Sequence, residues 1–134
     1  MSMARHRYFV YAASIVLLCL LAFAPFGHAG QPDVLKAVAS QQGSPGDNNF
    51  RFDVTIRSAD IGWDYYCDRF EIVAPDGRVL GTRVLYHPHD TEQPFTRSLS
   101  DVKIDKAVKS VEVRAFIKPT NEGGDTVKVE LPGR

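Results

Sequence analysis

Two histidines and two carboxylates stand close together in the segment His87-Pro88-His89-Asp90-Thr91-Glu92. The proline favours extended geometry at the residue before it, and residues i and i+2 of an extended segment project to the same side. His87 and His89 can therefore converge on one ion, with Glu92 as a third ligand and Asp64 as a candidate fourth ligand from elsewhere in the chain. Imidazole and carboxylate groups are suitable ligands for zinc or copper(II). One interpretation of this segment is thus a metal site, with an open position if only three residues bind.

Two other interpretations of the same segment need no metal. In a structural loop, the imidazoles of His87 and His89 donate to backbone carbonyl groups, and Glu92 pairs with Arg97 or caps a turn. Polar loops stiffened by residues such as Pro88 are common between strands. In the third interpretation, the segment is part of a surface that contacts a ligand or a protein.

A second cluster, residues 60–68, contains the only tryptophan of the chain, two tyrosines and three aspartates. These side chains could form an aromatic platform for a sugar or a peptide. Such a ligand or partner surface requires that Trp63, Tyr65, Tyr66 or Tyr86 face the solvent. The competing interpretation, which we favour from the sequence, makes Trp63 the large core residue that closes one end of a small fold.

Cys67 is the one cysteine that remains if residues 1–29 are removed. An intrachain disulfide is then impossible, so we expect a monomer that folds without one. No lysine or histidine adjoins Cys67, which favours a small buried side chain over a reactive thiol. Ser98 and Ser100 lack the strand-turn-helix setting of a nucleophile elbow. We therefore expect a non-enzymatic binding or accessory module, and a metal-dependent enzyme is the alternative.

The elements that must position these side chains are strands. Apolar and polar residues alternate with a period of two in residues 50–57, 111–118 and 127–131, and weaker apolar runs cover residues 34–40, 69–74, 79–86 and 95–102. Pro75-Asp76-Gly77 and the glycine-containing residues 121–125 predict turns. Seven short strands without an amphipathic helix predict a two-sheet sandwich of immunoglobulin or fibronectin III type, and a small closed barrel is the alternative.

The amino terminus has the pattern of a secretory signal. Arg5 and Arg7 precede an apolar run that extends to Ala24, and Gly27-His28-Ala29 provides small residues for a signal peptidase. We predict cleavage between Ala29 and Gly30, which would leave a periplasmic or secreted protein. The apolar run is shorter than a membrane anchor needs. A lipoprotein would need small residues before its cysteine, but Val16-Leu17-Leu18 precede Cys19.

Cleavage would leave 105 residues (134 − 29), from Gly30 to Arg134, which is enough for a single domain. The chain has 16 basic and 16 acidic residues, and loss of Arg5 and Arg7 would leave 14 against 16, a net charge of −2. The sequence has no basic stripe. We therefore expect neither nucleic-acid binding nor membrane binding after cleavage, and the partner is predicted to be an unknown protein or small ligand.

Three motifs bear on family membership: residues 62–68, 75–83 and 87–99. They resemble a group of small exported bacterial proteins that share the pattern GWDxYxD … PDGxVLGxR … HPHxxEQPFTRSL. The resemblance covers about residues 50 to 131 and implies no activity. It implies a histidine in relatives where this chain has Tyr65 and a small residue where it has Cys67, so Cys67 is not expected to be a shared catalytic thiol.

Overall fold

The computed structural model describes residues 30–134, and within this range the chain forms seven strands and no helix. The predicted signal segment, residues 1–29, lies outside the described residues. All seven strands predicted from the sequence are confirmed. They are β1 (Asp33–Gln42), β2 (Asn49–Arg57), β3 (Tyr66–Val73), β4 (Val79–Val84), β5 (Phe95–Lys103), β6 (Ser110–Lys118) and β7 (Val127–Glu130).

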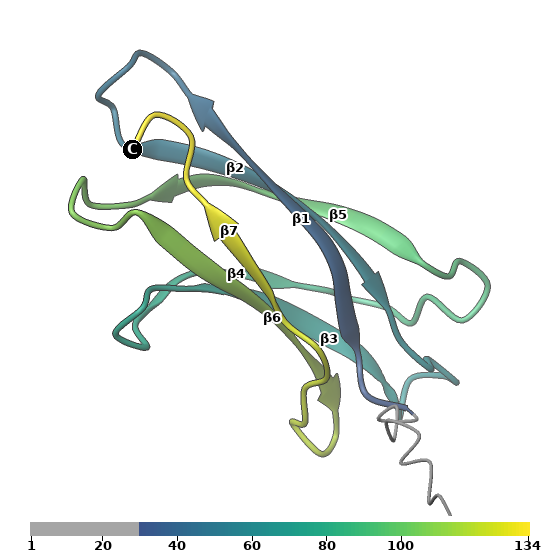
Figure 1. Cartoon of the computed structure of the whole chain (residues 1–134). Coiled ribbons are helices and arrows are strands. Elements are labelled where there is room, and N and C mark those ends of the chain that lie inside the picture. Colours follow the sequence, from purple (N-terminus) through teal and green to yellow (C-terminus); the bar gives the residue numbers. More distant parts are fainter. Residues whose placement is uncertain (1–29) are drawn as a thin grey trace, which may run out of the picture.

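The strands form two sheets that face each other, as Figure 1 shows. One sheet has three strands in the order β1-β2-β5, and the other has four in the order β4-β3-β6-β7. Every pair of neighbouring strands is antiparallel. No strand pairing joins the two sheets in the described part of the chain, so the predicted sandwich is confirmed and the closed barrel is wrong.

The core lies between the sheets because the inward side chains of each strand are apolar. On β2, Phe50 is 1% exposed, and the other three inward residues are fully buried. One of the two central strands of the opposite sheet, β6, contributes the same alternation. Complete burial of such side chains stabilises a fold by about 1.5–3 kcal/mol each. The inward residues of these two strands are Phe50, Phe52, Val54, Ile56, Val111, Val113, Ala115 and Ile117.

The predicted turn between β3 and β4 is confirmed. Its hydrogen bond runs from the N–H of Ala74 to the carbonyl oxygen of Arg78 at 2.8 Å. Gly77 has a φ of 89°, a left-handed conformation that glycine adopts without a steric cost. Asp76 adds a side-chain contact to the turn, because its carboxylate accepts from the N–H of Arg78 at 3.0 Å.

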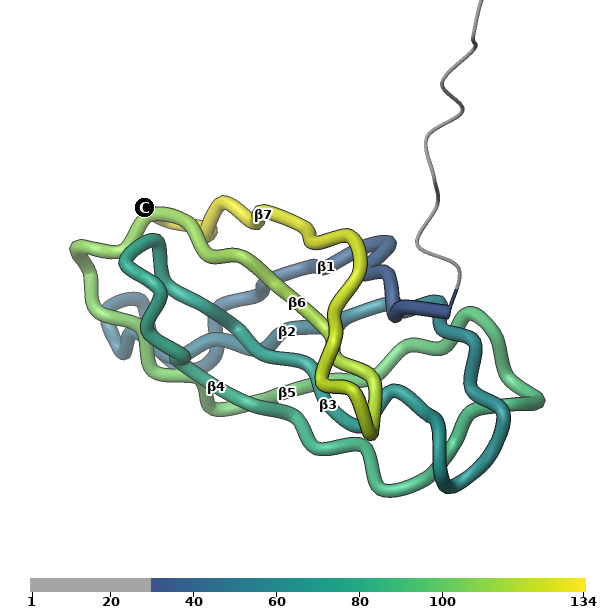
Figure 2. The backbone as a smooth tube through the Cα atoms, turned by 90° about the horizontal axis from the view of Figure 1, so that it is seen from below, coloured from purple at the N-terminus to yellow at the C-terminus, as the bar shows by residue number. Residues whose placement is uncertain are grey.

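Antiparallel order places the loops at two opposite ends of the sandwich, as Figure 2 shows for the β2–β3 and β4–β5 loops at one end and the carboxyl terminus at the other. We call the first the aromatic end; it comprises loop residues 58–65, 85–94 and 119–126. We call the second the C-terminal end; it comprises loop residues 43–48, 74–78 and 104–109 together with residues 131–134. Both clusters singled out in the sequence lie at the aromatic end.

Candidate functional site

The β2–β3 loop reverses the chain at Trp63 and Asp64. A bridge pairs Gly62 with Tyr65, and the N–H of Tyr65 donates to the carbonyl oxygen of Gly62 at 3.2 Å. Gly62 has a φ of 146°, which favours glycine at the first residue of this bridge. Trp63 and Asp64 thus form the tip of a tight turn, and both are exposed.

The expectation that Trp63 closes the core is wrong. Its side chain is 64% exposed, because it occupies the tip of the turn and not an inward position on a strand. Phenylalanines fill the core in its place, among them Phe52 and Phe70. Trp63 instead forms a T-shaped pair with Tyr66, with ring centroids 6.1 Å apart.

The four aromatic residues of the predicted partner surface have different environments. Tyr86 is 77% exposed, whereas Tyr66 is buried and Tyr65 is half-buried. The hydroxyl of Tyr65 donates to the carbonyl oxygen of Gly30 at 3.0 Å and so fixes the chain ahead of β1. Two of the four, Trp63 and Tyr86, therefore present aromatic surface to solvent.

Strand register gives the direction in which Tyr86 points. Val84 pairs with Arg69 of β3, and the N–H of Leu85 continues this ladder by donating to Asp68 at 2.8 Å. Leu85 is buried in the core, so Tyr86 projects to the outer face of the four-stranded sheet. Tyr66 occupies the same outer face.

Tyr66 pairs across the strands with Lys118, whose Nζ lies 5.4 Å from the centre of the tyrosine ring. A cation at this distance from an aromatic face is attracted to the ring. Trp63 therefore rests against a tyrosine that is itself covered by a lysine on the outer face of the sheet.

His87 and His89 lie side by side in the β4–β5 loop, with ring centroids 4.5 Å apart. The Nδ1 of His87 lies 3.0 Å from the carbonyl oxygen of Pro88. Because a carbonyl oxygen can only accept, His87 donates from Nδ1 in this contact. The hydrogen bond to a backbone carbonyl is the one that the structural-loop interpretation predicts for this ring.

The ring of His89 is almost completely buried. It stacks on Phe95 with centroids 3.9 Å apart and planes 9° apart, and the residue is 4% exposed. Neither ring nitrogen has a hydrogen-bond partner in the described part of the chain, and Nδ1 lies 3.8 Å from the carboxylate of Asp60. Burial, followed by the positive charge of Arg97, lowers the pKa of His89 from its usual 6.5. The packing therefore favours the neutral imidazole.

The remaining predicted metal ligands do not join the two histidines. Glu92 is exposed and accepts a hydrogen bond from Arg97 at 3.1 Å, which lowers the pKa of its carboxyl group. Asp64 is exposed at the tip of the other loop. Within residues 30–134, no three His, Cys, Asp or Glu side chains are grouped so that they could hold a metal ion.

Asp60 connects the β2–β3 loop, the start of β3 and the β4–β5 loop by hydrogen bonds. One carboxylate oxygen accepts from the hydroxyl of Ser58 and, at 2.9 Å, from the N–H of Cys67 at the start of β3. The other accepts from the N–H of His89 at 2.8 Å. The carboxylate is thus buried with three donors from two loops and a strand, the arrangement that a buried charge requires.

Gln93 makes a second link between the same two loops. Its side-chain oxygen accepts from the N–H of Ser58 at 2.9 Å, and its side-chain nitrogen donates to the carbonyl oxygen of His89 at 3.0 Å. From the sequence, Asp60 is one of the three aspartates of the aromatic cluster, and no role is predicted for Gln93. Hydrogen bonds across 29 and 35 residues leave no local pattern that would reveal either role.

Cys67 is fully buried, as the sequence predicts. Burial raises the pKa of its thiol to about 12, with a further contribution from the negative charge of Asp60. A thiol with this pKa is neutral at physiological pH and is a poor nucleophile. Cys67 therefore acts as a core residue at the beginning of β3.

Comparison with known proteins finds a similar sequence in Halomicrobium mukohataei, in a protein named "Putative lipoprotein". The two chains are 33% identical over 87 residues, which is 65% of this chain, and this chain spans 42% of the relative's length. No protein-family model matches the chain, and no solved structure matches it significantly. Among residues 30–134, no helix is long and apolar enough to cross a membrane.

The relative's name states neither a ligand nor a reaction. The fold and the described site define a class: an all-β sandwich with two exposed aromatic side chains on loops that a buried carboxylate holds together.

Proposed function

We propose that this protein is an exported, non-enzymatic binding module that contacts a protein partner through its aromatic end. The observation that carries the proposal is the exposure of Trp63 and Tyr86, at 64% and 77%, on loops tied to each other through Asp60. Tryptophan and tyrosine are the side chains that most often dominate the binding energy of protein interfaces.

The loop connections support binding because they lower its entropic cost. Ordering a loop or a long side chain on association costs about 0.5–1.5 kcal/mol for each immobilised side chain. Asp60 and Gln93 already connect the two loops by hydrogen bonds in the free protein. A partner therefore meets aromatic groups whose supporting backbone is in place.

The composition of the aromatic end favours a protein partner over a sugar. Ile61, two residues before Trp63, is 78% exposed and adds aliphatic surface with no hydrogen-bonding group. A sugar site combines aromatic rings with convergent polar groups, whereas a protein interface has an apolar centre with charges at its rim. Asp64 and Lys118 are positioned to be such rim charges.

We place the mature protein in the periplasm or outside the cell, as a monomeric single domain, with the signal cleaved between Ala29 and Gly30. The contact of Gly30 with the folded domain supports this boundary, because its carbonyl oxygen accepts a hydrogen bond from the hydroxyl of Tyr65. The residues before Cys19 do not favour lipid attachment, so we propose that this chain is released and not anchored. Mass spectrometry of the exported protein should give an amino terminus at Gly30; a lipid-modified Cys19 would contradict the cleavage proposal.

The partner surface can be tested by photo-crosslinking in the native host. A photoreactive phenylalanine analogue replaces Trp63, Tyr86 or Val38, the last being an exposed apolar position on β1 that serves as the control. We expect the same discrete protein adduct from positions 63 and 86 and none from position 38. Adducts that are identical at all three positions, or absent from 63 and 86, would contradict the proposal.

Metal binding is the second candidate function, and one observation favours it. The two histidine rings lie 4.5 Å apart, and both nitrogens of His89 lack a hydrogen-bond partner in the described residues. Binding of zinc or copper(II) would require the ring of His89 to leave Phe95, and Glu92 to leave Arg97 if it is the third ligand. Titration of the exported protein with zinc and copper(II), beside a His87→Ala/His89→Ala double variant, tests this function; stoichiometric submicromolar binding that the variant loses would establish it.

A further inference from the structure

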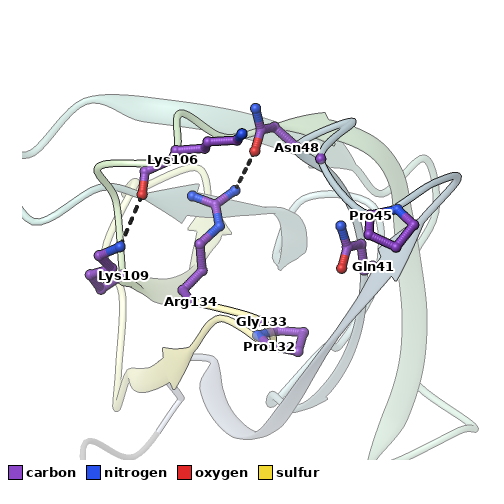
Figure 3. Close-up of a pocket in the computed structure, with 9 residues that line it drawn as sticks. Gln41, Pro45, Asn48, Lys106, Lys109, Pro132, Gly133 and Arg134 are labelled. Carbon is purple, nitrogen blue, oxygen red and sulfur yellow. Dashed lines mark hydrogen bonds between the residues drawn. The ribbon is translucent and has the colours of Figure 1, made fainter.

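The C-terminal end of the sandwich contains a pocket of about 450 Å³. The pocket lies between the β1–β2 loop, the β5–β6 loop and the last residues of the chain, as Figure 3 shows. Its volume is within the range of about 300–1,000 Å³ that small-molecule sites occupy. It is separate from the aromatic end, because its three segments lie at the opposite ends of the strands.

The charge of this pocket is positive. Lys106, Lys109 and Arg134 are among the 9 residues that line it, and none of the 9 is acidic. In the described part of the chain, none of these three cations forms an ion pair.

Arg134 supplies a fixed positive charge because neutral groups hold its guanidinium. It donates to the carbonyl oxygens of Asp105, Val108 and Ile104 at 2.5, 3.0 and 2.9 Å, and to the side-chain oxygen of Asn48 at 3.1 Å. The guanidinium also lies over the ring of Phe50, 5.1 Å from its centre. These contacts fix the position of the charge without neutralising it.

The two acidic side chains of the neighbouring loops form no ion pair with the three cations of the pocket within residues 30–134. Asp47 accepts from the N–H of Ser44 at 2.7 Å, and Asp105 accepts from the N–H of Ala107 at 2.8 Å. Each carboxylate is therefore engaged with the backbone of its own loop, and neither lines the pocket.

The two lysines provide the donors that a ligand would meet. Both are exposed, and the Nζ of Lys109 donates a 3.3 Å hydrogen bond to the carbonyl oxygen of Lys106. Figure 3 shows the side chains of Lys106, Asn48 and Arg134 together along one side of the pocket, with Pro45 and Gln41 on another side. An ammonium group is a mobile point charge that suits phosphate oxygens, and a proline wall suits an apolar portion of the same ligand.

We infer that this pocket binds the phosphate group of a small organic molecule or of a lipid headgroup. Lys106 and Lys109 donate to the phosphate oxygens, and Arg134 is the fixed charge behind them. The inference is independent of the proposed protein partner, because the aromatic end contributes no residue to the pocket.

The test uses the purified exported protein and pyrophosphate as the probe, titrated by calorimetry in 150 mM salt to screen weak surface attraction. We expect saturable one-to-one binding that Lys106→Gln/Lys109→Gln weakens at least tenfold. The matched control, Lys36→Gln/Lys128→Gln, removes two exposed lysines outside the pocket and should leave the affinity unchanged. Absence of saturable binding, or an equal loss in the control variant, would overturn the inference.

Vesicles distinguish the two sources of phosphate. Phosphatidylglycerol and phosphatidylcholine vesicles are compared for sedimentation of the wild-type protein and of the Lys106→Gln/Lys109→Gln variant. If pyrophosphate binds, additional binding to the anionic vesicles that the variant loses supports a lipid headgroup, and pyrophosphate binding without vesicle binding supports a soluble phosphate compound. Vesicle binding that the variant retains, in the absence of pyrophosphate binding, overturns the inference.

Discussion

The two ends of the sandwich are each held by one charged side chain, but the charges are opposite. At the aromatic end, the carboxylate of Asp60 accepts hydrogen bonds from Ser58, Cys67 and His89. At the C-terminal end, the guanidinium of Arg134 donates to three carbonyl groups and to Asn48. In both places neutral partners from separate segments satisfy the charge.

The difference between the ends lies in what each leaves exposed. Asp60 is buried, and the loops that it connects expose Ile61, Trp63 and Tyr86. Arg134 is only partly buried, and the pocket that it lines adds two lysines to its charge. At both ends, hydrogen bonds from one charged side chain connect separate segments. They support an apolar surface at one end and a cationic pocket at the other, so we expect the two ends to bind ligands of different chemical classes.

The largest effect should follow removal of the carboxylate that ties the aromatic end. In Asp60→Ala, the buried N–H groups of Cys67 and His89 lose their acceptor, and each unsatisfied buried group costs about 1–3 kcal/mol. We expect the free energy of unfolding to fall by about 2–6 kcal/mol in urea titrations. Asp64→Ala in the same loop is the control and should change it by less than about 0.5 kcal/mol. Equal effects of the two substitutions would show that Asp60 does not tie the loops.

Removal of the charge at the other end should have a smaller effect. Arg134→Ala deletes four hydrogen bonds, but the carbonyl groups that it leaves are near the surface, where water can replace it. We expect a loss of about 1–3 kcal/mol in the same measurement. Arg78→Ala, which removes an exposed arginine from the β3–β4 turn, should change stability by less than about 0.5 kcal/mol. If Arg134→Ala lowers the free energy of unfolding as much as Asp60→Ala does, the inference that the buried charge contributes more to stability than the partly buried one is contradicted.

The aromatic end should also make stability depend on pH. Burial lowers the pKa of His89 in the folded protein, so the unfolded chain binds more protons as the pH falls below 6.5. The stability that the neutral ring contributes is present above pH 6.5 and is lost as the pH falls towards the lower folded pKa. Urea midpoints at pH 7.5, 6 and 5, measured with a chelator present, should therefore decrease. His89→Phe, which retains the stacking on Phe95, should flatten this decrease; an unchanged slope would contradict the assignment.

The smallest effect on stability is expected at the most exposed aromatic surface. Because Trp63 is 64% exposed at the tip of a turn, Trp63→Ala should change the free energy of unfolding by less than about 0.5 kcal/mol. A buried tryptophan would cost about 3–5 kcal/mol. Thermal or urea unfolding distinguishes these values, and a loss in the larger range would mean that Trp63 supports the core after all.

Local patterns predicted the strands well because burial of one face leaves a period of two in the sequence. The turn at Gly77 and the burial of Cys67 were predictable for similar reasons, since each depends on adjacent residues. The position of Trp63 was not predictable from residue type, because the bridge between Gly62 and Tyr65 turns it outwards.

Contacts between distant segments could not be predicted from the sequence. Asp60 reaches His89 across 29 residues, and Arg134 reaches Asn48 across 86. The basic pocket was missed because Lys106, Lys109 and Arg134 form no continuous basic stretch, and the overall net charge conceals their proximity. Only the pairing of β-strands brings these groups together.

The most direct test of the account is the affinity of the crosslinked partner for the wild-type protein and for one variant of each end. Loss of an interface residue of hot-spot strength, about 2 kcal/mol, corresponds to roughly 30-fold weaker binding. We predict a weakening of about this size for Trp63→Ala and a change of less than about twofold for Lys106→Gln/Lys109→Gln. Binding that Trp63→Ala leaves unchanged, or that the lysine variant weakens as strongly, would contradict the assignment of the protein partner to the aromatic end.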